Sequence, residues 1–127
     1  LTSLKKAFEG NSVLHFTHEL SDIHNQLPFL DVLVTQLENN LHLGIYIKPT
    51  SAGTTLNGDG FCPEQYKRST ILSYLFRAYN VTNDWSEFHV ELQKIKSLLI
   101  NNNFSNGFVD RTVKEFLHKK MLRYSCF

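Results

Sequence analysis

The sequence is poor in the residue types that mark several classes of protein. Among its 127 residues are two cysteines, three prolines, one methionine and one tryptophan. It has no apolar run of about eighteen residues, so we expect no membrane-spanning helix. The opening letters, LTSLKK, contain neither the apolar core of a signal peptide nor an initiator methionine. We therefore expect an intracellular chain that is cut from something longer.

Cysteine and histidine form no pattern that is typical of a metal site. Cys62 and Cys126 lack metal-ligand spacing, and we predict two free thiols. His15 and His18 lie three positions apart in a predicted strand, so they point to opposite faces and cannot share an ion. The segment AGTTLNGDG lacks the helix start and lysine of a phosphate-binding loop. We therefore predict no catalytic residue, metal, cofactor or small-molecule substrate in this chain.

What the sequence does contain is an ordinary composition with an uneven distribution of charge. It is 42% hydrophobic and 20% charged, which is typical of one folded domain with a modest core. Residues 1–63 carry three basic and six acidic side chains, whereas residues 64–127 carry ten basic and six acidic ones. The basic second half favours a polyanionic partner such as nucleic acid. The alternative is a basic surface that contacts only solvent.

Alternation with period two in the first half predicts an antiparallel meander. The expected strands are residues 12–20, 27–36 and 41–48, because each alternates or concentrates large apolar side chains. Asn39 and Asn40 are expected to form the tight turn between the last two strands. A short helix, stopped by the glycine at position 10, is expected ahead of the strands.

From residue 62 onward the apolar period lengthens to three and four, which predicts three helices. The first is expected to begin at Pro63 and to end near Asn80. The second is expected to follow an N-cap at Thr82 or Asp84, with Glu87 completing a capping box.

Together these patterns predict an α+β fold, a three-stranded antiparallel meander followed by a three-helix bundle. The expected divisions are a meander in residues 1–50, a connecting loop in residues 51–63 and a helical module in residues 64–127.

Asp31 is the carboxylate inside the strand predicted for residues 27–36, where an unpaired buried charge would be costly. A two-residue turn at Asn39 and Asn40 would place Asp31 opposite Lys48. We therefore predict a structural ion pair between Asp31 and Lys48. A turn longer by one residue would shift the register and break this pair.

Basic side chains on the predicted helices suggest two surfaces for nucleic acid. Lys67, Arg68 and Arg77 share the first long helix. A rotation of about 100° per residue places Arg68 and Arg77 on nearly opposite faces, so only the side with Lys67 and Arg77 could follow a phosphate backbone.

The last two predicted helices resemble a helix-turn-helix in outline, because a short turn joins them. The final helix, capped by Ser105 or Asn106, would present Arg111, Lys114 and His118 to DNA at spacings of three and four. The alternative is a three-helix bundle whose amphipathic helices serve only its own packing.

Several short motifs follow one another at a spacing that is typical of one family. They are FTHE at 16–19, LPFLD at 27–31, YIKPT at 46–50, then Lys67-Arg68 and Arg77-Ala78. In this order they resemble the segment after the catalytic centre in reverse transcriptases of Penelope-like retroelements, over residues 8–120. The helical part is also similar to a helix-turn-helix domain of animal proteins of this kind.

This resemblance implies the end of the palm and the thumb of an RNA-directed DNA polymerase. The chain has no Asp-Asp pair, so the catalytic carboxylates that hold Mg²⁺ in the parent polymerase would lie upstream. The fragment would then have no polymerase activity and no cofactor of its own. Ile47 stands where the family has arginine, and Thr55-Leu56 where it commonly has Tyr-Leu. Both changes fit a decayed or domesticated copy.

The resemblance also implies partners. Lys48 would lie where these enzymes hold the primer end, and Lys67, Arg68 and Arg77 would contact the backbone of a template–primer duplex. The partners would be an RNA–DNA hybrid or DNA, and the upstream palm and fingers of the parent, in the nucleus and away from membranes. The alternatives are a helix-turn-helix module that binds DNA, and a non-catalytic remnant that serves as a protein-interaction domain.

Overall fold

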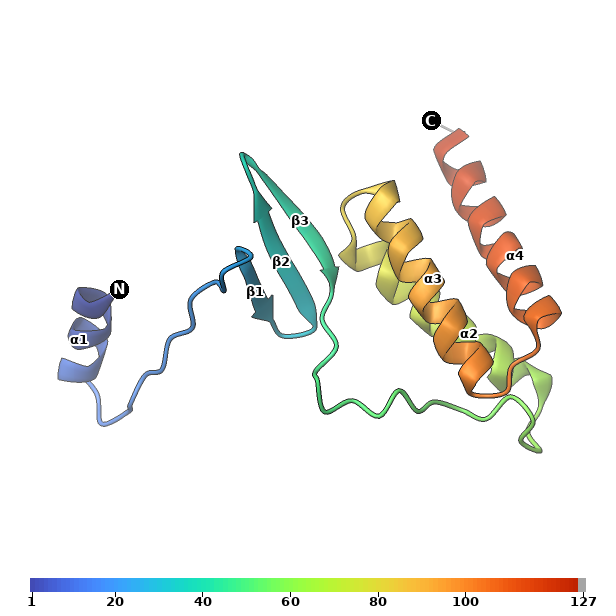
Figure 1. The fold of residues 1–127 in the computed structure, drawn as a ribbon, viewed down its shortest axis with the longest axis horizontal. Coiled ribbons are helices and arrows are strands. Elements are labelled where there is room, and N and C mark those ends of the chain that lie inside the picture. The colour runs from blue at the N-terminus through green and yellow to red at the C-terminus, as the bar shows by residue number, and fades with distance from the viewer. Residues whose placement is uncertain (126–127) are drawn as a thin grey trace.

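The computed structural model describes residues 1–125, so Cys126 lies outside the described residues. These described residues form four helices and three strands (Figure 1). The helices are α1 (Thr2–Gly10), α2 (Glu64–Val81), α3 (Trp85–Asn101) and α4 (Asn106–Ser125). The strands are β1 (Gln26–Phe29), β2 (Val32–Leu37) and β3 (Asn40–Ile45). This arrangement confirms the α+β fold, with an antiparallel sheet ahead of three packed helices.

The sheet has the order β1-β2-β3, but its strands are not those expected from the sequence. The run of residues 27–36 is folded into a hairpin, because Leu30 adopts a left-handed conformation with φ 57° and reverses the chain. The prediction of one continuous strand is therefore wrong. Splitting the run lets both halves pair, β1 with β2, which satisfies more backbone groups than a single strand would.

The register between β2 and β3 also differs from the prediction. Val32 lies opposite Ile45, and the turn is made by Glu38, with φ 50°, and Asn39. The predicted turn at Asn39 and Asn40 is therefore wrong by one position. In the observed register the N–H of Tyr46 donates to the Asp31 carbonyl at 2.8 Å, so Lys48 is not the cross-strand neighbour of Asp31.

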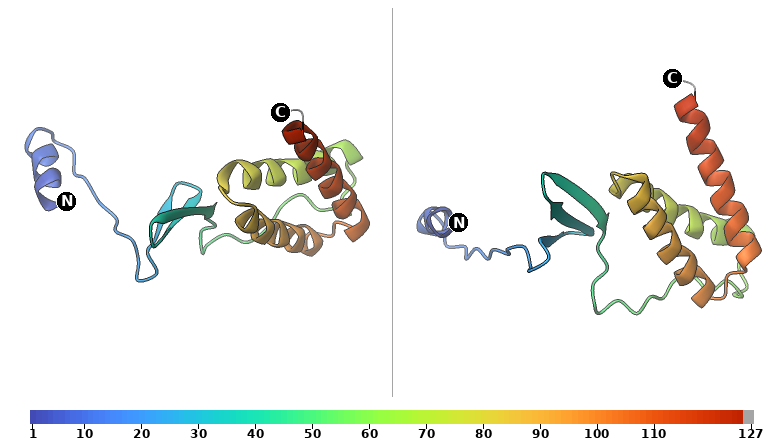
Figure 2. Two further views of the ribbon diagram at one scale, coloured as in Figure 1. Left: turned by 90° about the horizontal axis from the view of Figure 1, so that it is seen from above. Right: turned by 45° about the horizontal axis from the view of Figure 1, so that its top comes forward.

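The strand predicted for residues 12–20 is not formed. This segment has no regular secondary structure, and its side chains are exposed. Helix α1, at the far end of it, has no buried residue and lies apart from the rest of the molecule in every view (Figures 1 and 2). Alternating apolar residues form a strand only where a partner strand accepts their backbone hydrogen bonds, and none does here.

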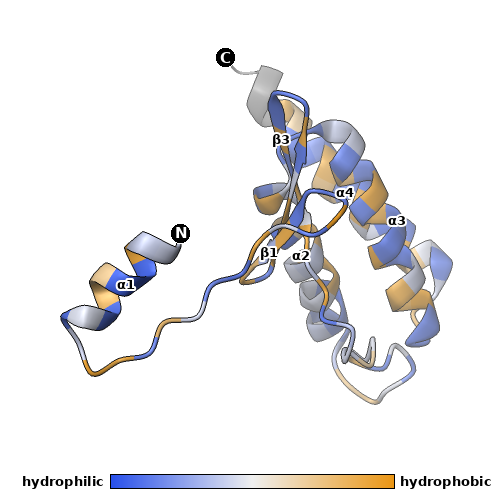
Figure 3. Ribbon diagram, turned by 60° about the vertical axis from the view of Figure 1, so that its left-hand side comes forward, coloured by the Kyte–Doolittle hydropathy of each residue, from blue (hydrophilic) through white to orange (hydrophobic). Residues whose placement is uncertain are grey.

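The core lies among α2, α3 and α4, where α2 packs against both other helices. The buried apolar residues recur at the predicted spacing of three and four, whereas Trp85, at the first position of α3, is 52% exposed. Apolar residues also occur along α1 and the sheet (Figure 3). The core consists of Ile71, Leu75, Ala78, Phe88, Leu92, Ile95, Leu99, Phe104, Val109, Val113 and Phe116.

The second predicted cap is confirmed in position but not in chemistry. Asp84 is the N-cap of α3, yet its side chain forms no capping hydrogen bond, so the capping box with Glu87 is wrong. Instead Asp84 accepts a hydrogen bond from the Ser86 hydroxyl at 2.5 Å, which lowers the pKa of the Asp84 carboxyl. Glu87 lies 3.7 Å from Nδ1 of His42 on β3.

The sheet is attached to the helices through its β3 edge. Asn83, between α2 and α3, accepts a hydrogen bond from the Leu43 N–H at 3.2 Å and donates to the Leu41 carbonyl at 2.7 Å. Its amide therefore substitutes for a neighbouring strand at this edge. Ile45 also packs against the helical core. None of the described helices is long and apolar enough to cross a membrane.

Candidate nucleic-acid interface

A short turn joins α3 to α4 and sets the angle between them. α3 ends at Asn101, and Asn103 then takes a left-handed conformation with φ 66°. The next residue, Phe104, is buried in the core, and its N–H donates to the Leu99 carbonyl at 3.0 Å. An asparagine tolerates this conformation better than most residues, and the buried phenylalanine fixes the turn against the bundle. The two helices are therefore held in a defined orientation.

The loop before α2 packs on this turn and reinforces it. The carbonyl of Asn102 accepts a hydrogen bond from the Gly58 N–H at 2.8 Å. The side chain of Asn102 accepts from the Thr55 N–H at 3.2 Å and donates to the Gly53 carbonyl at 3.0 Å. Gly58 approaches so closely that a Cβ there would lie 2.3 Å from the Asn103 carbonyl oxygen. We refer to residues 53–58 as the strap.

The outer face of α4 carries the side chains predicted for the alternative DNA surface. Arg111, Lys114 and His118 are exposed, whereas Val113 and Phe116 are buried on the opposite face. At about 100° per residue the three exposed side chains fall within roughly 60° of one another. Arg111 and Lys114 form no ion pair with any residue that the structure describes. Both full charges therefore face solvent.

The segment that contains this turn is similar to a known family. Residues 54–114 match the family model of the animal helix-turn-helix domain. The match begins in the strap and ends at Lys114 on α4, so it covers the whole of α2, α3 and the turn. No curated protein and no solved structure matches the chain.

Asp110, an acidic residue beside this face of α4, is already held in an ion pair. Asp110 lies 2.9 Å from the Lys96 ammonium on α3. The hydrogen bond and charge of Lys96, with a smaller contribution from the charge of Lys114, lower the pKa of the Asp110 carboxyl. This pairing leaves Arg111 and Lys114 as the unpaired charges at the start of α4, which an anion would meet first.

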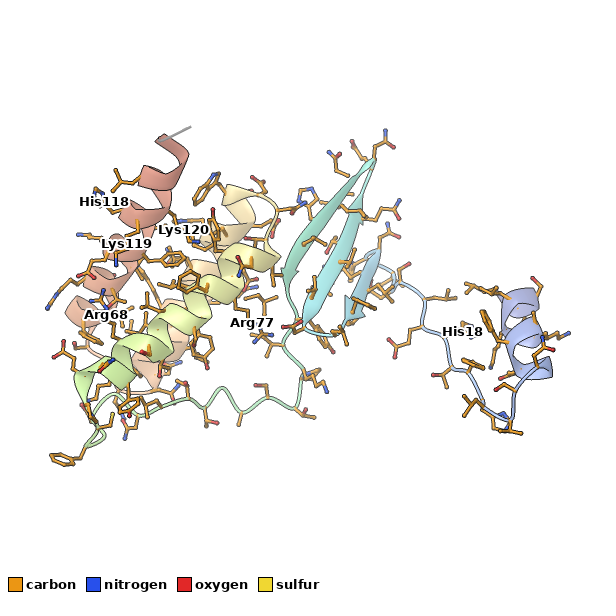
Figure 4. The ribbon with its side chains drawn as sticks, turned by 180° about the vertical axis from the view of Figure 1, so that it is seen from behind. His18, Arg68, Arg77, His118, Lys119 and Lys120 are labelled. Atoms are coloured by element: carbon orange, nitrogen blue, oxygen red, sulfur yellow. The ribbon has the colours of Figure 1, made fainter. Side chains whose placement is uncertain are left out.

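The residues predicted for a template–primer grip do not form one surface. Arg68 points toward α4 and Arg77 toward the sheet (Figure 4). Arg68 forms an ion pair and a hydrogen bond with Glu115 on α4. Lys67 faces a hollow of about 440 Å³ that Arg111 also lines, so the structure brings Lys67 to the same side as Arg111 of α4.

Arg77 and Lys48 lie together on the other side of α2. Both line a cleft of about 490 Å³ between the sheet and the helices, with Lys94 of α3. Arg77 is 3.2 Å from the Asp31 carboxylate, and its Nε is buried without a hydrogen-bond partner. Asp31 thus pairs with Arg77, and Lys48 forms no ion pair with the described residues. The prediction that Asp31 pairs with Lys48 is therefore wrong, because the turn between β2 and β3 lies one position earlier than predicted.

Sequence reasoning missed the pair formed by Glu91 and Lys94, which both line this cleft. Glu91 is only 4% exposed, and its carboxylate accepts a hydrogen bond from Lys94 at 2.8 Å. Gly44 of β3 lies beside it, and a Cβ there would be in ordinary van der Waals contact with Oε1 of Glu91, at 3.6 Å. The available signal was a glutamate on the apolar stripe of α3, with a lysine three residues later.

The described residues offer little for metal or thiol chemistry. Within residues 1–125 no group of three or more His, Cys, Asp or Glu side chains could hold a metal ion. Cys62 is a free thiol in the same hollow as Lys67 and Arg111.

Proposed function

We propose that the helix-turn-helix domain binds duplex DNA, with α4 as the helix that enters the major groove. The observation that carries this proposal is the exposed, unpaired face of Arg111 and Lys114 on the second helix of a matched helix-turn-helix. The groove, about 12 Å wide, admits one α-helix, and arginine and lysine there bind guanine edges or phosphates. His118 lies one turn beyond Lys114 and would lengthen the contact.

Lys67 supports this proposal from the neighbouring helix. It lines the same hollow as Arg111, near the start of α2. Flanking lysines of this kind contact phosphates and fix the register of a recognition helix without reading sequence. The proposed footprint therefore consists of Arg111, Lys114 and His118 on α4, with Lys67 beside it.

The test is a fluorescence-anisotropy titration of labelled duplex DNA at several salt concentrations. We expect the variant Arg111→Ala/Lys114→Ala/His118→Ala to lose most of its affinity. Its slope of log K against log salt should fall by about 0.9 for each phosphate contact removed. The control Lys5→Ala/Lys6→Ala removes two charges from the remote α1 and should leave both affinity and slope unchanged.

A second candidate function rests on the cleft between the sheet and the helices. We propose that a chain of this kind could instead grip a template–primer hybrid, as the resemblance to Penelope-like reverse transcriptases implies. The supporting observation is that Lys48 and Arg77 line one cleft, together with Tyr46 and Tyr74. Basic and aromatic side chains in one groove are typical of surfaces that follow a nucleic-acid strand. The upstream palm and fingers would then contact the sheet, and the fragment itself would have no polymerase activity.

The variant Lys48→Ala/Arg77→Ala separates the two functions, because it also removes two full charges. If α4 is the interface, this variant keeps its affinity for duplex DNA while the α4 variant loses it. Preference for an RNA–DNA hybrid, abolished by Lys48→Ala/Arg77→Ala and not by the α4 variant, would support the second candidate and refute the first. Either function would place the protein in the nucleus.

A further inference from the structure

Three aromatic rings surround the ammonium group of Lys120 on the seam between α2 and α4. Its Nζ lies 4.2 Å from the ring centroid of Tyr79, 4.9 Å from that of Phe76 and 5.6 Å from that of Phe116. All three distances fall within the roughly 6 Å over which a ring face attracts a cation. Phe76 and Tyr79 come from α2, whereas Phe116 lies one turn before Lys120 on α4. We refer to Phe76, Tyr79 and Phe116 as the aromatic cage.

The rings of the aromatic cage stand at steep angles to one another, as the walls of a pocket do. Phe76 meets Phe116 at 88° with centroids 5.0 Å apart, and Tyr79 meets Phe116 at 81° and 6.1 Å. Phe116 is only 3% exposed and belongs to the core. Tyr79 is supported from behind by edge contacts with Trp85 and Phe88. The walls are therefore held by the bundle and do not depend on Lys120.

The aromatic cage is accessible from solvent. Phe76 is 44% exposed, and a hollow of about 170 Å³ lies beside it, lined also by Leu72, Phe116 and Lys120. Arg68, Lys119 and Glu115 also line this hollow, and Glu115 is paired with Arg68, so the charged side chains of the rim do not by themselves attract a cation. The ring faces around Nζ of Lys120 are what favour an organic cation here.

We propose that the aromatic cage is a binding site for a methylated ammonium group, and that Lys120 is an internal occupant which the ligand displaces. A primary ammonium is strongly hydrated, so Lys120 gives up favourable contact with water to occupy the rings. Methyl groups spread the same charge over an apolar surface, which lowers the cost of leaving water. Because a methylated ammonium keeps its charge but costs less to remove from water, aromatic rings bind it more favourably than a primary ammonium.

This site is separate from the proposed DNA interface. Lys120 lies nine residues after Arg111, which on α4 corresponds to a rotation of about 180°. Figure 4 places Lys120 toward α2. The inference therefore goes beyond the proposed function, and the failure of either one leaves the other standing.

The test titrates the protein with choline and, separately, with an Nε-trimethyl-lysine peptide, and follows the aromatic ring resonances by NMR. Lys120→Gln empties the aromatic cage without introducing a charge, and Lys114→Gln, on α4 but outside the lining of this hollow, is the matched control. We expect Lys120→Gln to bind saturably, with shifts at Phe76, Tyr79 and Phe116. The wild type and Lys114→Gln should bind at least about tenfold more weakly, because Lys120 competes. If choline binds more tightly, the ligand is a small choline-like molecule; if the peptide binds more tightly, the ligand is a methylated lysine of another protein.

The wild-type protein provides a second readout that requires no variant of Lys120. In the free protein, the ring currents should shift the Lys120 ε-methylene resonances upfield, and saturating choline should move them toward the values of a solvated lysine. A neutral isostere of choline, with carbon in place of nitrogen, tests whether charge matters. Equal binding of that isostere, no saturable shift in folded Lys120→Gln, or unmoved Lys120 resonances at saturation would each overturn the proposal.

Discussion

Gly58→Ala tests the contact between the strap and the turn that joins α3 to α4. An alanine Cβ at this position would lie 2.3 Å from the Asn103 carbonyl oxygen and 2.5 Å from the Phe104 backbone nitrogen. Both are backbone atoms, so no side-chain rotation can relieve the overlap. Either the strap leaves the turn and the Gly58 N–H loses its bond to Asn102, or the turn itself moves.

The magnitude follows from these two costs. Overpacking costs about 1–3 kcal/mol, and a backbone obstacle places this site at the upper end of that range. Loss of the hydrogen bond adds about 1 kcal/mol. We therefore expect the free energy of unfolding to fall by about 3–4 kcal/mol, which for a domain of this size lowers the midpoint temperature by roughly 12 °C or more.

The assay is thermal unfolding followed by far-ultraviolet circular dichroism, with Gly107→Ala as the matched control. Gly107 lies in the first turn of α4, and a Cβ there meets no atom within 4 Å. The same chemical change should therefore stabilise the protein slightly, by up to about 0.5 kcal/mol, through helix propensity. If Gly58→Ala changed the unfolding free energy by less than about 0.5 kcal/mol, the described packing of the strap on the turn would be incorrect.

Further predictions concern the core, the sheet and one surface ion pair. Leu99→Ala should lower the free energy of unfolding by about 2–5 kcal/mol, because Leu99 is fully buried, whereas Leu4→Ala on exposed α1 should change it by less than about 0.5 kcal/mol in the same denaturant titrations. Asn83→Ala should accelerate amide exchange in β3 and leave α4 unchanged, since it removes two hydrogen bonds from one sheet edge. Lys96→Met should raise the pKa of Asp110 toward its ordinary value, measured by carboxyl NMR. Because the pKa of Asp110 is lowered in the folded protein, its ionised carboxylate stabilises the wild type above the unfolded pKa of about 3.9. This stabilisation is lost as the pH falls through the folded-state pKa, so the free energies of unfolding of the variant and the wild type should converge in acid.

The three helices of the second half were predictable from the sequence because a helix depends on the pattern of residues close to one another in the chain. Apolar spacing of three and four identified α2, α3 and α4, and apolar residues at this spacing form the buried core. Each helix satisfies its own backbone hydrogen bonds, so its limits depend mainly on residues close in sequence, such as Pro63 and Asp84. The match of residues 54–114 to a helix-turn-helix family falls in this half.

The sheet was predicted in class but not in detail. A strand depends on which neighbour accepts its hydrogen bonds, and the apolar pattern of residues 27–36 fits one strand or two equally well. The left-handed turn at Leu30 and the turn at Glu38 decided between them. The same register placed Asp31 beside Arg77 in place of Lys48. A one-position error in a turn thus changed the partner of every side chain after it.

By itself, the sequence determined the α+β class, the three amphipathic helices and the exposed basic face of Arg111 and Lys114, because these follow from periodicity along one chain. Only the tertiary structure decided which basic residues lie together, because that depends on how helices cross. It separated Arg68 from Arg77, joined Lys67 to Arg111, and surrounded Lys120 with rings from two helices. Contacts between residues distant in sequence carry no periodic signal, so they appear only once the elements are packed.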